Sequence, residues 1–172
     1  GIVSLGHAAF FGFGAYTAGL FAKHVMPDPL AGLAVAMGAS ALLGAVCSVL
    51  VLRGSDLTRL MVTLGVAAVL YELANKLEFT GGADGLQGIV MGPLLGRFEF
   101  DLYGRTAYAY SLITLIVVML IARRIVHSPF GYSLKALRDN RLRATSIGLS
   151  VNLRLAAVYT LAAAIAGMAG AL

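Results

Sequence analysis

Charge is scarce in this sequence. Only 12% of its 172 residues are Asp, Glu, Lys or Arg, against about 25% in an average soluble domain, and 59% are hydrophobic. The mean hydropathy is +0.88. So few charges among so many apolar side chains argue against a soluble domain and indicate a membrane protein.

Cysteine is almost absent as well. The single cysteine, Cys47, has no partner in the chain, so we expect neither a disulfide framework nor a cysteine metal site. The chain opens on GIVSLGHAAF, without the basic region or the Met of a secretory signal peptide. We therefore interpret residues 1–172 as an internal fragment of a longer protein, part of one transmembrane domain that is truncated at both ends.

The net charge of +5 raises the question of nucleic acid binding. Proteins that bind DNA carry their basic residues on a polar surface. Here Lys and Arg lie at the ends of apolar runs, as they do in membrane proteins. We therefore expect no nucleic acid partner, and we expect the lipid bilayer to surround the chain.

Five apolar runs predict an all-α, polytopic bundle of transmembrane helices. The clearest run has no charged residue and, at about 1.5 Å per residue, extends roughly 34 Å, which spans a hydrocarbon core. The first run is rich in glycine, and we interpret it as a span with an irregular start. In order, the predicted spans are 2–25, 30–52 (the clearest), 57–77, 106–122 and 153–172.

Small residues recur at every fourth position in two of these runs. This spacing places them on one helix face, where they let a neighbouring helix approach closely in lipid. The first stripe is Gly32, Ala36, Ser40, Gly44 and Ser48, and the second is Ala163, Gly167 and Ala171.

Basic residues predict the orientation in the membrane. With five spans, one side receives Arg53, Arg59, Arg123, Arg124, Lys135, Arg138, Arg141, Arg143 and Arg154, and the other receives Lys23, Lys76, Arg97 and Arg105. The side richer in Lys and Arg is expected to be cytoplasmic. The segment from Thr80 to Arg105 is then extracytoplasmic, and the segment from Ser128 to Gly148 is cytoplasmic.

The segment 128–148, SPFGYSLKALRDNRLRATSIG, combines local signals for a turn, a helix and a cap. Pro129 and Gly131 predict a turn over 128–131, and Gly148 is placed to end the helix in a left-handed conformation. One short helix is expected between them, with Leu134, Leu137 and Leu142 at roughly helical spacing and an ion pair between Asp139 and Arg143.

We interpret 128–148 as a helix that docks on a cytoplasmic partner. The alternative is that its Lys and Arg residues only set the topology and attract anionic lipid, at about 1 kcal/mol per residue. Topology alone needs only a few charges, which favours the docking helix.

Two further features are candidates for contact with a ligand. His7 has no Ser, Cys or carboxylate at catalytic spacing, so we expect it to pack or to line a pathway rather than to act in catalysis or bind a metal. The run Gly81-Gly82-Ala83-Asp84-Gly85 can present backbone amides to an anion, or Asp84 to an ammonium group. A flexible external turn explains this run equally well.

Four segments together resemble one family. They are SLGHAAFFGFGAYTAGL at 4–20, TGGADGLQGI at 80–89, FDLYGRTAYAYSL at 100–112 and SPFGYSLKALRDNRLRATSIGLSV at 128–151. In this order they are similar to motifs of the permease subunits of ABC importers for branched-chain amino acids. The resemblance implies a bacterial or archaeal plasma (inner) membrane, a second permease subunit, two cytoplasmic ATPase subunits and an extracytoplasmic substrate-binding protein.

The resemblance also implies roles for individual residues. The coupling segment of ABC importers follows the pattern Glu-Ala-Ala, three variable residues, Gly; aligned on Gly148, it matches only at Ala144 and Gly148, and Leu142 replaces the acid. The residues expected to line the substrate pathway are Ser4, His7, Gly81, Gly82 and Asp84. Those expected to couple to the ATPase are Pro129, Gly131, Leu137, Arg138, Ala144 and Gly148.

The expected chemistry is transport rather than catalysis. The chain has no G-x-x-x-x-G-K-[ST] phosphate loop, so we expect ATP to be bound and hydrolysed by partner subunits and no cofactor or metal to be bound here. Two alternatives are a permease for urea or short amides and, from a different class, an intramembrane enzyme or ion-coupled secondary transporter that uses His7, Glu72 and Asp84.

Overall fold

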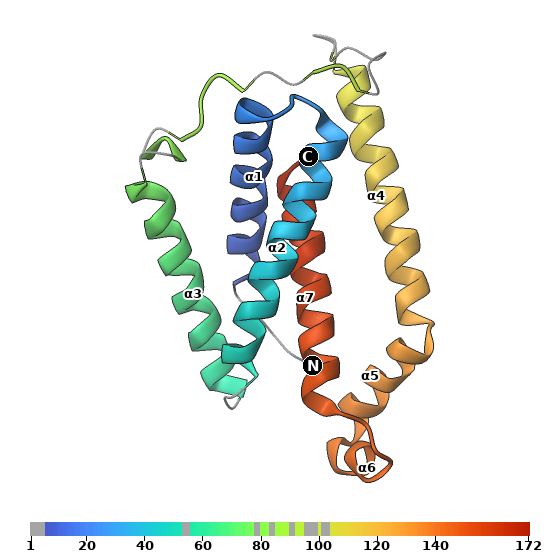
Figure 1. Ribbon diagram of the computed structural model, residues 1–172. Coiled ribbons are helices and arrows are strands. Elements are labelled where there is room, and N and C mark those ends of the chain that lie inside the picture. Colours follow the sequence, from blue (N-terminus) through green and yellow to red (C-terminus); the bar gives the residue numbers. More distant parts are fainter. Residues whose placement is uncertain are drawn as a thin grey trace.

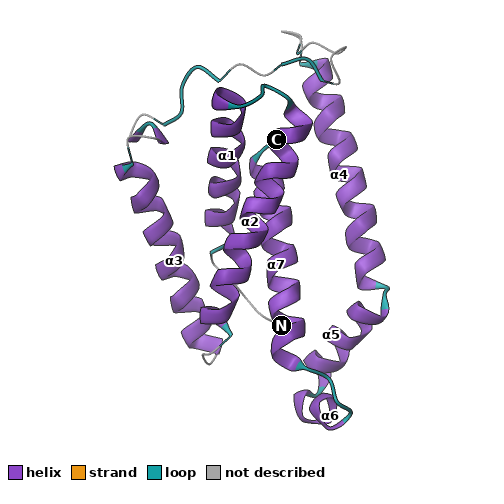
Figure 2. Cartoon of the chain, in the orientation of Figure 1, coloured by secondary structure: helices purple, strands orange, loops and turns teal. Residues whose placement is uncertain are grey.

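The computed structural model describes residues 6–52, 56–77, 80–82, 85–89, 92–94, 100 and 104–172, and most of these residues are helical. Figure 2 shows helices joined by loops, without a strand in these residues. The helices are α1 (His7–His24), α2 (Pro29–Val51), α3 (Asp56–Lys76), α4 (Arg105–Val126), α5 (Pro129–Asp139), α6 (Arg141–Ser146) and α7 (Val151–Gly170).

Four of the described helices are long and apolar enough to cross a membrane: Pro29–Val51, Leu57–Lys76, Arg105–Val126 and Val151–Gly170. They correspond to four of the five predicted spans. The remaining predicted span forms α1, which has 18 residues and is therefore about 27 Å long. Helix α1 is shorter than the other four, carries His7, Lys23 and His24, and is not among the four; residues 2–5 of that predicted span lie outside the described residues.

The long helices alternate in direction (Figure 1). Helices α1, α3 and α7 run one way, and α2 and α4 run the other. One end of the bundle therefore holds the α1–α2 connection and the described residues between α3 and α4 (77, 80–82, 85–89, 92–94, 100 and 104), with Lys23, Lys76 and Arg105. The opposite end holds α5 and α6, which project beyond the bundle, and the larger group of basic residues: Arg59, Arg123, Arg124, Lys135, Arg138, Arg141, Arg143 and Arg154.

The core of the bundle is the close packing of α1, α2 and α7. All five residues of the predicted α2 stripe are buried, and so are Ala163 and Gly167 on α7. The two stripes meet: a Cβ added at Gly167 would overlap the Ser40 side chain, and one at Gly44 would overlap Ala163. A Cβ at Gly14 of α1 would overlap the Gly167 carbonyl. The small residues therefore allow the three backbones to approach closely.

Larger side chains fill the core toward the end that carries α5 and α6. Phe10, Cys47, Val51, Tyr159 and Ala163 form one buried cluster contributed by α1, α2 and α7. Phe10 and Tyr159 stack edge to face with their ring centroids 5.8 Å apart. This arrangement is a favourable geometry for aromatic pairs and fixes α1 against α7.

Helix α4 stands apart from this core. Tyr110 is its buried residue, and the Tyr110 hydroxyl donates to the Pro29 carbonyl at the start of α2 (3.3 Å). Outward side chains such as Ile113, Leu115 and Met119 are more than 60% exposed. An apolar helix with such a surface suits hydrocarbon surroundings.

Candidate functional site

The segment 128–148 begins with a helix and not with the predicted turn. Ser128 caps α5 directly: its Oγ accepts from the Gly131 amide (3.3 Å) and donates to the Ile125 carbonyl (2.6 Å). Pro129 is the first helical residue, a position that needs no N–H donor. The predicted turn over 128–131 is therefore wrong, because the helix starts at once.

Gly131 is not the turn residue that the sequence predicts. It lies inside α5, and its φ is not among the positive values found in the described residues. A Cβ there would lie 2.6 Å from the Ile125 carbonyl oxygen and would overlap that of Val126. Gly131 thus allows α5 to fold back tightly on the end of α4.

The segment contains two helices instead of one. Asn140 is extended (φ −153°, ψ 104°), ends α5, and caps α6 by accepting from the Arg143 amide at 3.0 Å. The predicted pair between Asp139 and Arg143 does not form, because the break separates the two helices. Asp139 instead lies 3.5 Å from Arg138 Nε, with both side chains exposed.

The end of the segment confirms the prediction for Gly148. This glycine has φ +82°. Its amide donates to the Thr145 carbonyl (3.0 Å), and the Leu149 amide donates to the Ala144 carbonyl (3.1 Å). These two bonds are the Schellman pattern that closes a helix with a left-handed residue. A Cβ at Gly148 would meet nothing within 4 Å, so the glycine is needed for its conformation alone.

The predicted coupling residues divide by exposure. Leu137 and Ala144 are buried and hold α5 and α6 in place, whereas Arg138 is exposed. The prediction that Leu142 continues the helical spacing of Leu134 and Leu137 is wrong, because Leu142 lies on α6 and is 81% exposed, whereas Leu137 is buried. With Ile147, 74% exposed, it presents an apolar surface among arginines at the tip of the protein.

One contact of the segment 128–148 could not be predicted from the sequence. Arg154, in the first turn of α7, donates from Nη1 to the Ser133 hydroxyl of α5. Ser133 is buried and donates in turn to the Phe130 carbonyl at 2.6 Å. The basic-residue pattern indicates only that Arg154 lies on the side with most arginines. Pairing it with a serine 21 positions earlier requires the fold.

His7 lies in an aromatic cluster at the start of α1. Its ring is half-buried and meets Phe10 and Tyr159 edge to face, with centroids 6.0 and 5.9 Å away. Of the two roles predicted for His7, this geometry favours packing. Among the described residues, no group of three or more His, Cys, Asp and Glu side chains could hold a metal ion.

Gly81 and Gly82 lie at the other end of the bundle, after α3, so the structure does not bring them to His7. Both are left-handed, with φ of +82° and +56°. The Gly82 amide donates to the Leu77 carbonyl (3.3 Å), and the Thr80 hydroxyl donates to the carbonyls of Ala74 and Leu77. The segment thus caps α3. The other two predicted pathway residues, Ser4 and Asp84, lie outside the described residues.

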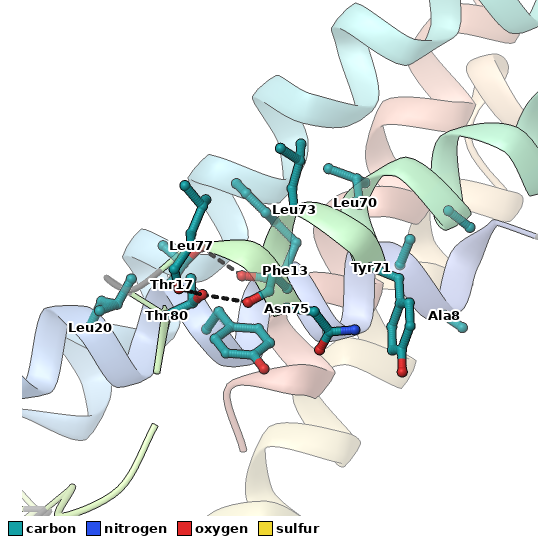
Figure 3. Close-up of a pocket in the computed structure, with 15 residues that line it drawn as sticks. Ala8, Phe13, Thr17, Leu20, Leu70, Tyr71, Leu73, Asn75, Leu77 and Thr80 are labelled. Carbon is teal, nitrogen blue, oxygen red and sulfur yellow. Dashed lines mark hydrogen bonds between the residues drawn. The ribbon is translucent and has the colours of Figure 1, made fainter. Parts of the chain in front are cut away.

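A cavity of about 630 Å³ lies between α1 and α3 (Figure 3). Its walls are apolar, and the polar side chains among them come from Tyr16, Thr17, Tyr71, Asn75 and Thr80. None of the predicted pathway residues lines it, although Ala8 and Thr80 neighbour His7 and Gly81 in the chain. The α1 wall lies within 4–20, one of the four segments that carry the family resemblance.

Comparison with known proteins gives a consistent result over the whole chain. The family model described as "Branched-chain amino acid transport system / permease component" matches residues 1–172. The high-affinity branched-chain amino acid transport system permease proteins LivM of Salmonella typhimurium strain LT2 and of Escherichia coli strain K12 are 32% and 31% identical to it over 199 aligned positions.

The alignments cover all of this chain but 46% of each relative, so the chain spans about half the length of the curated proteins it matches. No solved structure matches it. The match to the family model over the full chain, together with helices long and apolar enough to cross a membrane several times, shows that the chain is a multi-pass membrane protein of the branched-chain amino acid transport system permease family.

Proposed function

We propose that this chain forms part of the permease subunit of an ABC importer and moves branched-chain amino acids across the membrane. The observation that carries the proposal is the α5–α6 unit, which projects from one end of a bundle of this permease family and ends in the Schellman cap at Gly148. The two LivM relatives, named for branched-chain amino acid transport, support the substrate class.

The partner set follows from this role. A second permease subunit completes the pathway, and an extracytoplasmic binding protein delivers the amino acid. Two cytoplasmic ATPase subunits bind and hydrolyse ATP. The exposed Leu142 and Ile147, with arginines around them, suit a docking surface for one ATPase subunit, because exposed apolar patches rimmed by polar side chains mark protein–protein contacts and arginine is enriched in interfaces.

The orientation follows from charge. The end of the bundle that bears α5 and α6 also bears most of the basic residues, so we assign it to the cytoplasm of a bacterial or archaeal cell whose plasma (inner) membrane holds the bundle. The opposite end, which holds the α1–α2 connection and the C-terminal end of α3, then faces the side from which the binding protein approaches.

A movement of the docking unit, formed by α5 and α6, can be transmitted to the bundle through direct contacts. The contact between Arg154 and Ser133 ties α5 to α7, and α7 is packed without space for a methyl group against Ser40 of α2. Helices packed this closely move together rather than deform. Shifting the permease from 1:99 to 99:1 between its two accessible states needs about 5.5 kcal/mol, which closure of the ATPase pair on nucleotide supplies.

Uptake into liposomes tests the proposal. The full-length permease is reconstituted with its second permease and both ATPase subunits, and radiolabelled leucine, isoleucine and valine are offered with the binding protein. We expect uptake that requires ATP. Uptake driven by an ion gradient without nucleotide, or uptake of urea in place of the amino acids, contradicts the proposal.

A further inference from the structure

We infer that the cavity between α1 and α3 receives the apolar side chain of the transported amino acid, with the charged head group at Asn75 and Thr80. This inference rests on the proposed function, which supplies the substrate class. The cavity itself supplies the place and the direction in which the substrate lies.

The first argument is the shape of the interface. At the end that carries α5 and α6, α1 and α3 touch: Thr63 is fully buried, and a Cβ at Gly6 would lie 2.7 Å from the Thr63 carbonyl oxygen. Toward the other end α3 leans away from α1 (Figure 1). The contact between Gly6 and Thr63 therefore bounds the cavity on the proposed cytoplasmic side, and its lining extends to Leu20 and Leu77 toward the proposed outer side.

The second argument is the chemistry of the walls. Phe13, Leu20, Leu70, Leu73 and Leu77 supply apolar surface from both helices (Figure 3). A volume of about 630 Å³ lies within the range of small-molecule sites, about 300–1,000 Å³. An aliphatic side chain gains free energy on leaving water for such walls.

The third argument is the polar end. Asn75 lies in the last turn of α3 and Thr80 follows that helix, so both lie at the end of the cavity away from Gly6 and Thr63. The Asn75 amide can both donate and accept, so it suits a carboxylate or an ammonium group. The Thr80 hydroxyl donates to the carbonyls of Ala74 and Leu77, which leaves its oxygen to accept from an ammonium. A head group arriving from outside meets these two side chains first.

Gly12 offers a clean way to fill the cavity. It lines the cavity, and a Cβ there would meet nothing within 4 Å, so a larger side chain enters empty space without displacing a helix. Gly38 on α2 has equally open surroundings but is exposed and does not line the cavity. Gly12→Leu and Gly38→Leu therefore form a matched pair in helix propensity and added volume.

The experiment measures uptake of leucine and alanine by the full-length importer in liposomes, with membrane abundance determined for each variant. In Gly12→Leu we expect the ratio of leucine to alanine uptake to fall by roughly tenfold, since a few methylene groups in an apolar pocket discriminate by about 10–200-fold. Gly38→Leu should keep the wild-type ratio. Asn75→Ala should lower uptake of both amino acids together, because the head group is common to them.

The outcomes separate the inference from the function beneath it. A wild-type importer that takes up neither amino acid overturns both. A wild type that takes them up, with the same ratio in Gly12→Leu and Gly38→Leu and full uptake in Asn75→Ala, overturns the cavity assignment alone and indicates a lipid chain or another helix in the gap. Asn75→Ala decides the matter if Gly12→Leu fails to reach the membrane.

Discussion

The guanidinium of Arg154 at the start of α7 donates a hydrogen bond to the Ser133 hydroxyl in α5. This bond joins the projecting α5–α6 unit to a helix of the packed core, apart from the chain connection through Gly148. In the proposed function Arg154 would act as a positioning residue for coupling, and the bond distinguishes this arginine from the exposed ones on α6.

Replacing Arg154 with Ala should uncouple ATP hydrolysis from transport. The loss of a hydrogen bond from a charged donor corresponds to about 1.5–3 kcal/mol, less where water can replace it. We expect fewer amino acid molecules moved per ATP hydrolysed in liposomes, with the protein still in the membrane. Arg124→Ala removes the same charge from an exposed site at the end of α4, away from the proposed docking surface, and serves as the control. The role of the hydrogen bond is contradicted if both variants transport the same number of amino acid molecules per ATP hydrolysed.

Replacing Gly148 with Val should also lower coupling. A β-branched residue at φ +82° is strained by roughly 1–2 kcal/mol or more. The C-terminal cap of α6 should therefore open, and the orientation of α6 relative to α7 should change. Gly148→Asn should retain most transport because asparagine tolerates this conformation better. Substrate-stimulated ATPase activity and uptake are the measurements. Wild-type values for Gly148→Val would contradict the role of the cap.

Ala144→Asp places a carboxylate at a position that is 2% exposed. An unsatisfied buried polar group costs about 1–3 kcal/mol, and a buried charge costs more. Helix α6 should therefore lose its packing against the rest of the protein. We expect uptake to fall while membrane abundance stays near wild type. The control is Thr145→Asp, which adds the same charge at the adjoining, exposed position. The idea fails if both variants behave alike.

Gly167→Leu should destabilise the bundle rather than uncouple it. Its side chain would enter the space of Ser40, and overpacking of this kind costs about 1–3 kcal/mol, occasionally more. We expect a lower melting temperature in detergent and less folded protein in membranes. Gly65→Leu on α3, where a Cβ meets nothing within 4 Å, should leave the melting temperature close to wild type. An unchanged melting temperature in Gly167→Leu would exclude the close packing of α2 on α7.

Several features of the fold were within reach of the sequence because their causes are local or periodic. Apolar runs of sufficient length predict the long helices, since the bilayer core leaves few other backbone structures. The stripe from Gly32 to Ser48 predicts a buried helix face, and Gly148 predicts a left-handed cap. The structure confirms the stripe and the cap.

Other features of the candidate site required the packed chain. The sequence indicates that Gly131 is special, but it suggests a turn, whereas the structure shows close approach of α5 to the end of α4. The break at Asn140 redirects Leu142 outward and separates Asp139 from Arg143. Helical spacing describes one continuous helix, so a single extended residue changes every side-chain direction beyond it.

The sequence by itself determined the membrane class, the long helices, the close-packing faces and the family of this protein, because hydropathy, small-residue spacing and motif order are properties of the chain read in one dimension. Only the tertiary structure decided which faces meet: Ser40 with Gly167, Ser133 with Arg154, and α1 with α3 around a cavity. The physical reason is that a periodic pattern defines a face but leaves its partner open. The partner is fixed when helices distant in the sequence pack against one another.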